Sequence, residues 1–372
     1  MRLQSASAQK SSLDLDISGY IKELGRASVD NGFSEIHYDN ILHHRLETEW
    51  NLSKNFELRA DLRTRLLNGY TVNNTPGLKQ IYEQDANYFD WSWVWFGTNY
   101  SLMHSNIDRL HLSYINGPWE VHAGRQRLNW GRTFVWNPND LFNNYAFLDF
   151  DYEERPGVDA FSAQYNWSYA SNLDVGYRIA GSWEQSVLAG MVRTNWGNYD
   201  IQFTGGHYLN QLTIGAGWAG YLGNTGFKGE ISYFHPENDL FEETGHFTAT
   251  TGLDHMLSNG VYLQGEMLYN GGYSQRRNPL TTLVRPPSAD NLFIAKTGFF
   301  LNSSYQFHPL ISGNIGFLSS FDRSIFITIP QVTVSVAENL DFLLLSQLLK
   351  GAVFNQTVAA PNLFFFRLKW SY

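Results

Sequence analysis

The stretch FELRADLRTRL, residues 56–66, decides the fold class because its side chains alternate between two chemical types. One parity is apolar apart from Thr64, and the other carries only charged side chains: Glu57, Arg59, Asp61, Arg63 and Arg65. A period of two is the period of a β-strand with two different faces. The preceding stretch LHHRLETEWNL, residues 42–52, alternates in the same way and places Glu47 and Glu49 on its polar face. These residues therefore predict two adjacent strands, each apolar on one side and charged on the other.

The composition indicates where the apolar face lies. The 372 residues contain 16% aromatic and only 16% charged side chains, yet mean hydropathy is −0.32. No run of eighteen apolar residues occurs, which excludes a transmembrane helix. A transmembrane β-barrel gives this combination, because lipid-facing and lumen-facing residues alternate and cancel in the average. The net charge of −9 argues against nucleic acid as a partner.

The spacing of the turns separates a membrane barrel from a soluble sandwich. We count about eighteen candidate strands of roughly nine to twelve residues, the length of an inclined membrane crossing. Short turns, such as Gly197-Asn198 and Gly223-Asn224-Thr225, alternate with connections that include every long segment. Those long segments are 27–40, 68–105, 130–157, 235–245, 270–292 and 351–362. Short periplasmic turns opposite long external loops are typical of outer-membrane barrels, so Arg276-Arg277 is expected to be external.

The last ten residues, LFFFRLKWSY, alternate again and end on an aromatic side chain. Here the chain resembles bacterial outer-membrane proteins, whose C-terminal strand is read by the barrel-assembly machinery. The resemblance implies that machinery as a partner, with an assembly signal formed by Phe366, Leu368, Trp370 and Tyr372. The usual terminal residue of such strands is Phe, from which Tyr372 departs slightly.

These patterns predict an all-β fold: one transmembrane antiparallel β-barrel of about eighteen strands in residues 13–372. Residues 1–12 form an N-terminal arm, and their segment SASAQ is either a remnant of a signal peptide or an unstructured arm. The expected location is the outer membrane of a Gram-negative bacterium, with its lipid and lipopolysaccharide as partners. Pro330, within IFITIPQVTVSV, is expected to mark a bulge or edge where the inward parity switches.

The third external loop, 130–157, carries the strongest functional signal. Arg125, Arg127 and Arg132 are interleaved with aromatic residues before the turn Asn137-Pro138-Asn139-Asp140. The loop then ends in a run that includes Asp149, Asp151, Glu153 and Glu154. A loop folded into the barrel explains both features, since aromatic residues would pack on the wall and charges would line water. The alternative is an ordered external loop whose charges pair with one another.

The stretch GRQRLNWGR…NPND resembles alginate-export-like and related porin-like barrels of about eighteen strands. That resemblance implies an inward-folded third loop, but it implies no particular solute. The expected pore-lining and constriction residues lie on the charged strands and in this loop: Glu47, Glu49, Arg59, Asp61, Arg63, Arg65, Arg125, Arg127, Arg132, Asp149, Asp151 and Glu153. Charges of both signs in a narrow pore select solutes, although pairing between neighbouring strands also explains their proximity.

Other motifs leave several interpretations open. The second external loop contains NYFDWSWVWFGTNY, with Trp91, Trp93 and Trp95 at a period of two. This segment is an interfacial aromatic girdle, a sugar-stacking platform or a protein-contact surface. The acidic loop HPENDLFEE is either a calcium or lipopolysaccharide-cation site or a solvated loop.

The sequence contains no catalytic motif, and we expect no enzyme activity, no cofactor and no metal. The predicted function is an outer-membrane porin-like channel for small hydrophilic or anionic solutes, which include saccharides. Those solutes would pass through a charged, partly plugged lumen. The alternative is a non-conducting barrel subunit of a larger outer-membrane assembly, with the external loops as docking surfaces for protein partners.

Overall fold

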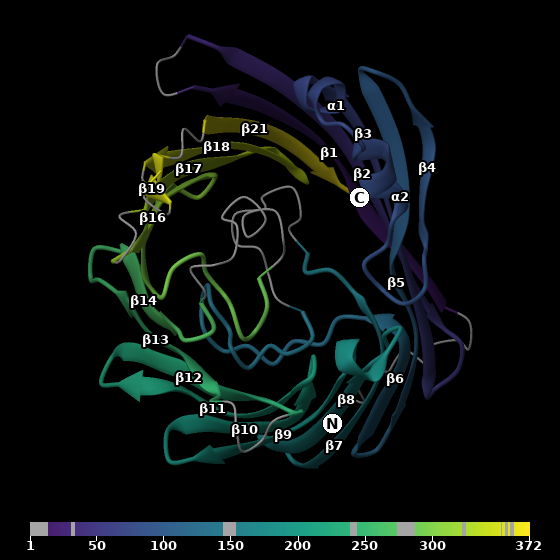
Figure 1. The fold of residues 1–372 in the computed structure, drawn as a ribbon, viewed down its shortest axis with the longest axis vertical. Coiled ribbons are helices and arrows are strands. Elements are labelled where there is room, and N and C mark those ends of the chain that lie inside the picture. Colours follow the sequence, from purple (N-terminus) through teal and green to yellow (C-terminus); the bar gives the residue numbers. More distant parts are fainter. Residues whose placement is uncertain are drawn as a thin grey trace, which may run out of the picture.

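The protein forms a closed antiparallel β-barrel of eighteen strands (Figure 1). The computed structural model describes residues 14–30, 34–143, 154–238, 244–273, 287–321, 325–350 and 361–372, together with the backbone of Ala352–Val353 and Gln356–Thr357. Each strand pairs with its sequence neighbour, and β1 closes the ring by pairing with the last strand, β21. The fold class predicted from the alternation is therefore confirmed.

The strands vary in length from one part of the barrel to another. In chain order the barrel strands are β1 (Asp14–Val29), β2 (Ile36–Asn51), β3 (Phe56–Gly69), β5 (Ser101–Asn116), β6 (Trp119–Gln126), β7 (Val158–Ser168), β8 (Ser171–Arg178), β9 (Val187–Trp196), β10 (Tyr199–Tyr208), β11 (Gln211–Leu222), β12 (Thr225–Pro236), β13 (His246–Met256), β14 (Tyr262–Asn270), β15 (Thr297–His308), β16 (Ile311–Ser320), β17 (Phe326–Ala337), β18 (Leu340–Lys350) and β21 (Asn362–Ser371). A separate two-stranded pair consists of β19 (Ala352–Val353) and β20 (Gln356–Thr357).

The connections alternate between the two ends of the barrel. One end, the turn end, carries tight turns such as 197–198, 223–224 and 338–339, and both termini of the barrel lie there. The other end, the loop end, carries the long connections 70–100, 127–157 and 271–296. These three connections are called loop 2, loop 3 and loop 7, after their order at the loop end.

Loop 2 contains α1 (Tyr70–Asn74), α2 (Leu78–Glu83) and one additional strand, β4 (Ser92–Gly97). β4 pairs with the loop-end half of β5, at 102–106, whereas β6 pairs only with the turn-end half, 110–116. β4 therefore continues the wall where β6 has ended, as Figure 1 shows beside β5. No helix within the described ranges combines the length and the apolar character needed to cross a membrane.

The two faces of the wall follow the predicted parity. Phe364, Phe366 and Leu368 of β21 are exposed on the outside, whereas Asp61 and Arg63 of β3 are almost fully buried on the inside. A continuous apolar outer surface is what hydrocarbon requires, because water is absent there.

Pro330 does not switch the parity, contrary to expectation. The register between β16 and β17 runs without a shift from Ile311↔Val334 to Ser319↔Phe326. Ile327 and Ile329 face inward, and Gln331 continues on the same face and lines a cavity. Proline lacks an N–H donor. Its effect here is local: the pairing of β17 with β18 is interrupted between Thr328 and Gln331 and then continues in the same register.

A bulge occurs instead in β5, where the register with β3 shifts between Asp61↔Arg109 and Leu62↔Ile107. Asp108 is the extra residue. Because a bulge places two consecutive residues opposite one partner, Asp108 and Arg109 are both buried on the inner side, at 3% and 6% exposure. The bulge therefore adds a charge of each sign to one point of the wall.

Adjacent residues of β16 provide a test of the two faces. Ile315 is exposed on the outer side and Asn314 lines an inner cavity. Ile315→Arg is expected to cost about 2–4 kcal/mol of unfolding free energy, the cost of a cation near the bilayer midplane. Asn314→Arg should cost much less, because its charge meets water. Denaturant titration in lipid vesicles measures both values, and equal or reversed costs would contradict the assigned parity.

The orientation of the barrel can be tested on a clean background, because the chain contains no cysteine. A cysteine at Asn238, at the loop end, should react with an impermeant maleimide on intact cells. A cysteine at Asn224, in a turn, should react only after the outer membrane is permeabilised. The reverse result would place the loop end in the periplasm.

Candidate functional site

Loop 3 is bound to the inner wall through two buried carboxylates, Glu230 of β12 and Glu266 of β14. Glu266 accepts hydrogen bonds from the backbone N–H groups of Phe134, Val135 and Trp136, at 2.8, 2.8 and 2.9 Å. These bonds satisfy backbone donors that would otherwise be buried without a partner.

Glu230 holds the neighbouring part of loop 3 in the same way. Its Oε1 accepts from the backbone N–H groups of Arg132 and Thr133, and its Oε2 accepts from Asn139 at 2.9 Å. Residues 132–139 therefore surround two side chains of the wall, one on β12 and one on β14, with β13 between them. We call Glu230 and Glu266 the anchor carboxylates.

Apolar side chains of loop 3 pack on the wall on either side of these anchors. Trp130, Leu141 and Phe142 join one buried cluster with residues of β7, β9 and β12, such as Ala189 and Phe234. Trp130 is 1% exposed, and its indole N–H donates to Asp174 of β8 at 2.9 Å.

A second buried cluster contains Val135 and Trp136 of loop 3 and apolar residues of β14–β18. Residues 287–296 of loop 7 contact this second cluster: the ring centroids of Phe293 and Trp136 are 5.4 Å apart. Figure 1 shows the described parts of loops 3 and 7 inside the ring of strands. These contacts place aromatic rings of the loop against the inner wall.

Small residues make room for this packing. A Cβ atom added to Gly176 of β8 would lie 2.6 Å from the ring of Phe142, and one added to Gly215 of β11 would lie 2.4 Å from Oδ1 of Asn139. Such separations are too short for non-bonded heavy atoms. The inner wall is therefore shaped to the loop as well as bonded to it.

Arg125 has a different environment from the one expected of a pore-lining residue. It is 2% exposed, and its guanidinium donates to both oxygens of Asp159, to Asp85, and to the carbonyls of Ile107 and Phe89. These bonds occupy all five N–H donors of an arginine. Arg125 therefore fastens loop 2 to the wall, and its charge is neutralised.

Arg45 of β2 occupies the centre of a second charged cluster. It is 1% exposed and lies 2.8 Å from Asp61, 2.7 Å from Asp108 and 2.6 Å from Glu47. Glu154, which follows the turn of loop 3 in the sequence, lies 3.9 Å from the guanidinium of Arg45. The β5 bulge supplies Asp108 to this cluster, so the network depends on an irregularity of the sheet.

The charged wall residues predicted from the sequence lie at different positions along β2 and β3, between the turn end and the loop end. Arg59 is paired with Asp61 at 3.0 Å and with Glu47 at 3.7 Å, and Glu49 is its cross-strand neighbour. Arg63 is nearly buried and donates to His43, whereas Arg65 lies 5.0 Å from the ring of Tyr82 in α2. The structure thus brings Glu47, Asp61 and Arg59 together and separates them from Arg65.

A cavity of about 590 Å³ lies between loop 3 and the wall on the turn-end side. Strands β2, β3 and β5–β9 contribute to it, and its lining is rich in ionisable groups: Arg45, Glu47, Glu57, Arg59, Arg109, His111, Glu120, His122, Arg127, Glu154, Asp174 and Arg193. We call it the charged cavity.

Two arginines of the charged cavity are uncommitted. The side chains of Arg127 and Arg193 make no hydrogen bond or ion pair with any residue in the described ranges. Burial and the neighbouring Arg155 lower the pKa of the Arg127 guanidinium, while Asp140 opposes that effect. Arg132, by contrast, donates to Gln202 at 3.0 Å and lies 3.9 Å from Asp200.

Asp140, in the turn of loop 3, is fully buried and forms an ion pair with Arg155. Burial raises the pKa of this carboxyl to about 7, while Arg155 opposes that effect.

Three predicted acidic residues of loop 3, Asp149, Asp151 and Glu153, lie outside the described residues, as do Arg276 and Arg277. The expected assembly residues Phe366, Leu368, Trp370 and Tyr372 all lie on the exposed outer parity of the barrel's final segment.

The charged cavity also contains a hydrogen-bonded series of Ser113, His122 and Glu120. Ser113 Oγ lies 2.8 Å from Nδ1 of His122, whose Nε2 lies 2.9 Å from Glu120. Ser113 is only 2% exposed, and the paired strands β5 and β6 direct their backbone N–H groups into the sheet. Among the described residues, no group of three His, Asp or Glu could hold a metal ion.

No protein-family model and no curated protein matches the chain. Solved structures do match. OccAB1 of Acinetobacter baumannii gives a TM-score of 0.61 at 9% identity, over 99% of each chain. OccD3 (OpdP) of Pseudomonas aeruginosa gives 0.59 at 8% identity, over 97% of this chain and 92% of that chain.

OccK8 (OprE) of Pseudomonas aeruginosa gives a TM-score of 0.58 at 9% identity, over 96% of this chain and 98% of that chain. The fold is that of an outer-membrane porin. At such low identity the porin fold is what these comparisons establish.

Sequence reasoning missed the anchor carboxylates and the Asp108 bulge. A signal for the anchors exists, since Gly229-Glu230 and Gly265-Glu266 each place a single acidic residue on the inward parity of a strand. The bulge has no comparable signal. It depends on the register between β3 and β5.

The anchors can be tested by isosteric substitution. Glu230→Gln with Glu266→Gln replaces an acceptor oxygen on each side chain by an N–H donor, which opposes the backbone donors of loop 3. We expect loop 3 to leave the wall and single-channel conductance to rise. Glu237→Gln, a neighbouring carboxylate at the loop end, is the control. Unchanged conductance in the double variant would contradict the role of the anchors.

Proposed function

We propose that the protein is a porin-like channel through which small hydrophilic solutes, and preferably anionic ones, cross the outer membrane. The porin fold supplies a polar path past the hydrocarbon. Loop 3, bound to the anchor carboxylates, narrows this path and sets its size limit.

The observation that carries the proposal is the charged cavity with its two uncommitted arginines. Most other charges on this wall are paired: Arg45 with Asp61, and Arg125 with Asp159. Paired charges contribute little net field, whereas Arg127 and Arg193 retain theirs. A positive field in a confined aqueous space raises the local concentration of anions. The preference is therefore local and does not follow the overall charge of −9.

The arginines also have a geometric role. Arg127 lies at the start of loop 3 and Arg193 on β9, so they border the charged cavity from the loop and from the wall. A solute passing between loop 3 and the wall meets both. The acidic side chains Glu57 and Glu120 line the same cavity, and they limit the preference for anions.

Ion selectivity tests this proposal. Arg127→Gln with Arg193→Gln should shift the reversal potential in a salt gradient toward cation preference, and the shift should shrink at high ionic strength because salt screens the field. Lys54→Gln with Lys79→Gln removes the same formal charge from exposed positions outside the charged cavity. That control should leave the reversal potential nearly unchanged.

Two results would contradict the proposal. A purified protein that folds but carries no ion current in planar bilayers would favour the non-conducting subunit of a larger assembly. A current whose selectivity responds equally to the arginine pair and to the lysine control would show that the charged cavity does not govern selection.

A further inference from the structure

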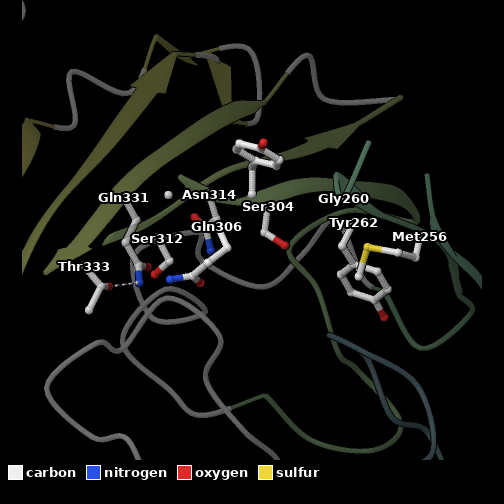
Figure 2. Close-up of a pocket in the computed structure, with 11 residues that line it drawn as sticks. Met256, Gly260, Tyr262, Ser304, Gln306, Ser312, Asn314, Gln331 and Thr333 are labelled. Carbon is white, nitrogen blue, oxygen red and sulfur yellow. Dashed lines mark hydrogen bonds between the residues drawn. The ribbon is translucent and has the colours of Figure 1, made fainter. Parts of the chain in front are cut away.

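A second cavity, of about 470 Å³, lies on the wall formed by β13–β17 at the turn end (Figure 2). Within the part of the chain that the structure describes, its lining contains no charged residue, in contrast to the charged cavity. The side chains are amides and hydroxyls, with Tyr262 and Met256 at one side, as Figure 2 shows. We call it the neutral cavity.

The polar side chains of the neutral cavity form a regular array. Three adjacent strands each contribute two inward residues: Ser304 and Gln306 from β15, Ser312 and Asn314 from β16, and Gln331 and Thr333 from β17. Cross-strand pairing aligns them in two rows, Ser304–Asn314–Gln331 and Gln306–Ser312–Thr333. Neighbouring strands are roughly 4.8 Å apart, so each row presents polar groups at intervals that suit a small ring-shaped solute.

Several of these groups are free to bind a solute. Gln331 donates to Thr333 at 3.3 Å, and Gln306 donates to the carbonyl of His308 at 2.6 Å. The side chains of Ser304, Ser312 and Asn314 make no hydrogen bond with another residue of the described ranges. Hydroxyl and amide groups both donate and accept, which matches the hydroxyl groups of a polyol or a sugar.

The polar array occupies only the turn-end part of these strands. Further toward the loop end the inward residues of the same strands become apolar, as Phe300, Leu318 and Ile329 show, and they are covered in the cluster that includes Trp136 of loop 3. The array begins where this cover ends. A solute on the turn-end side of loop 3 therefore meets a charged surface on one wall and an uncharged hydroxyl–amide surface on another.

We propose that the neutral cavity is a binding subsite for uncharged, hydroxyl-rich solutes of the saccharide class. Amide and hydroxyl groups replace the water around the sugar hydroxyls, and the ring of Tyr262 offers an apolar surface to sugar C–H groups. The proposal rests on the channel function above, and it adds a solute class that the arginines of the charged cavity would not select.

Maltotriose is a suitable probe, applied to the turn-end side of the protein in a planar bilayer. We expect it to interrupt the ion current in a concentration-dependent manner. Asn314→Leu with Gln331→Met removes the central polar groups of one row and should weaken the apparent affinity about tenfold, the effect of losing roughly two neutral hydrogen bonds. Ion conductance should persist.

The matched control is Ile315→Leu with Val332→Met, which changes the adjacent outward residues of the same strands. It should leave the maltotriose effect unchanged. No interruption in the unmodified protein, or equal interruption in both variants, would overturn the subsite and leave the channel intact.

If the folded protein carries no ion current, the channel proposal fails, and the subsite is then tested by saturation-transfer NMR of maltotriose on the detergent-solubilised protein. A transfer signal that disappears in Asn314→Leu with Gln331→Met would support the subsite. Absence of the signal in the unmodified protein would overturn it.

Discussion

The binding of loop 3 by two carboxylates is the interaction on which the interior of this barrel depends. A loop inside a lumen must satisfy its backbone N–H groups without a neighbouring strand. Glu230 and Glu266 do so for residues 132–139, with three donors each. A buried backbone donor left without a partner costs about 1–3 kcal/mol. The two side chains therefore fix the path of loop 3, and the rings of Trp130 and Trp136 pack where that path leads them.

This arrangement divides the turn-end side of the lumen into two chemically different walls. The charged cavity lies against β2–β9, and the neutral cavity lies against β13–β17. The division follows from the strand sequences, because inward positions of β3 carry Arg and Asp whereas those of β16 carry Ser and Asn. A single barrel can thus offer one surface to anions and another to uncharged hydroxyl-rich solutes.

Much of the fold could be predicted from the sequence, because period-two alternation depends only on neighbouring residues. Residues 56–66 show the two faces, and the alternation of short and long connections gives the barrel. The parity switch predicted at Pro330 is wrong, since proline at an outward position interrupts only local pairing and does not shift the strand. The density of Arg and Trp in loop 3 is visible in the sequence, and the structure places Trp130 and Trp136 in the two buried clusters.

The sequence did not allow us to predict which charged side chains are paired, because pairing depends on contacts between residues that are distant in the sequence. Arg125 is neutralised by Asp85, forty positions away, and by Asp159. Arg127, two residues further along, is uncommitted among the described residues. Nothing in the local sequence distinguishes these two arginines. The register of β3 with β5, which creates the Asp108 bulge, likewise arises only when the sheet forms.

Hydrogen–deuterium exchange of the loop 3 amides tests the central claim most directly. The N–H groups of residues 132–136 belong to no strand. All five donate to the anchor carboxylates, and Thr133 also donates to Asn137, so the protection of the other four reports on the anchors. We predict slow exchange in the unmodified protein, and fast exchange of this segment in Glu230→Gln with Glu266→Gln while the strand amides stay protected. Fast exchange of 132–136 in the unmodified protein would contradict the account.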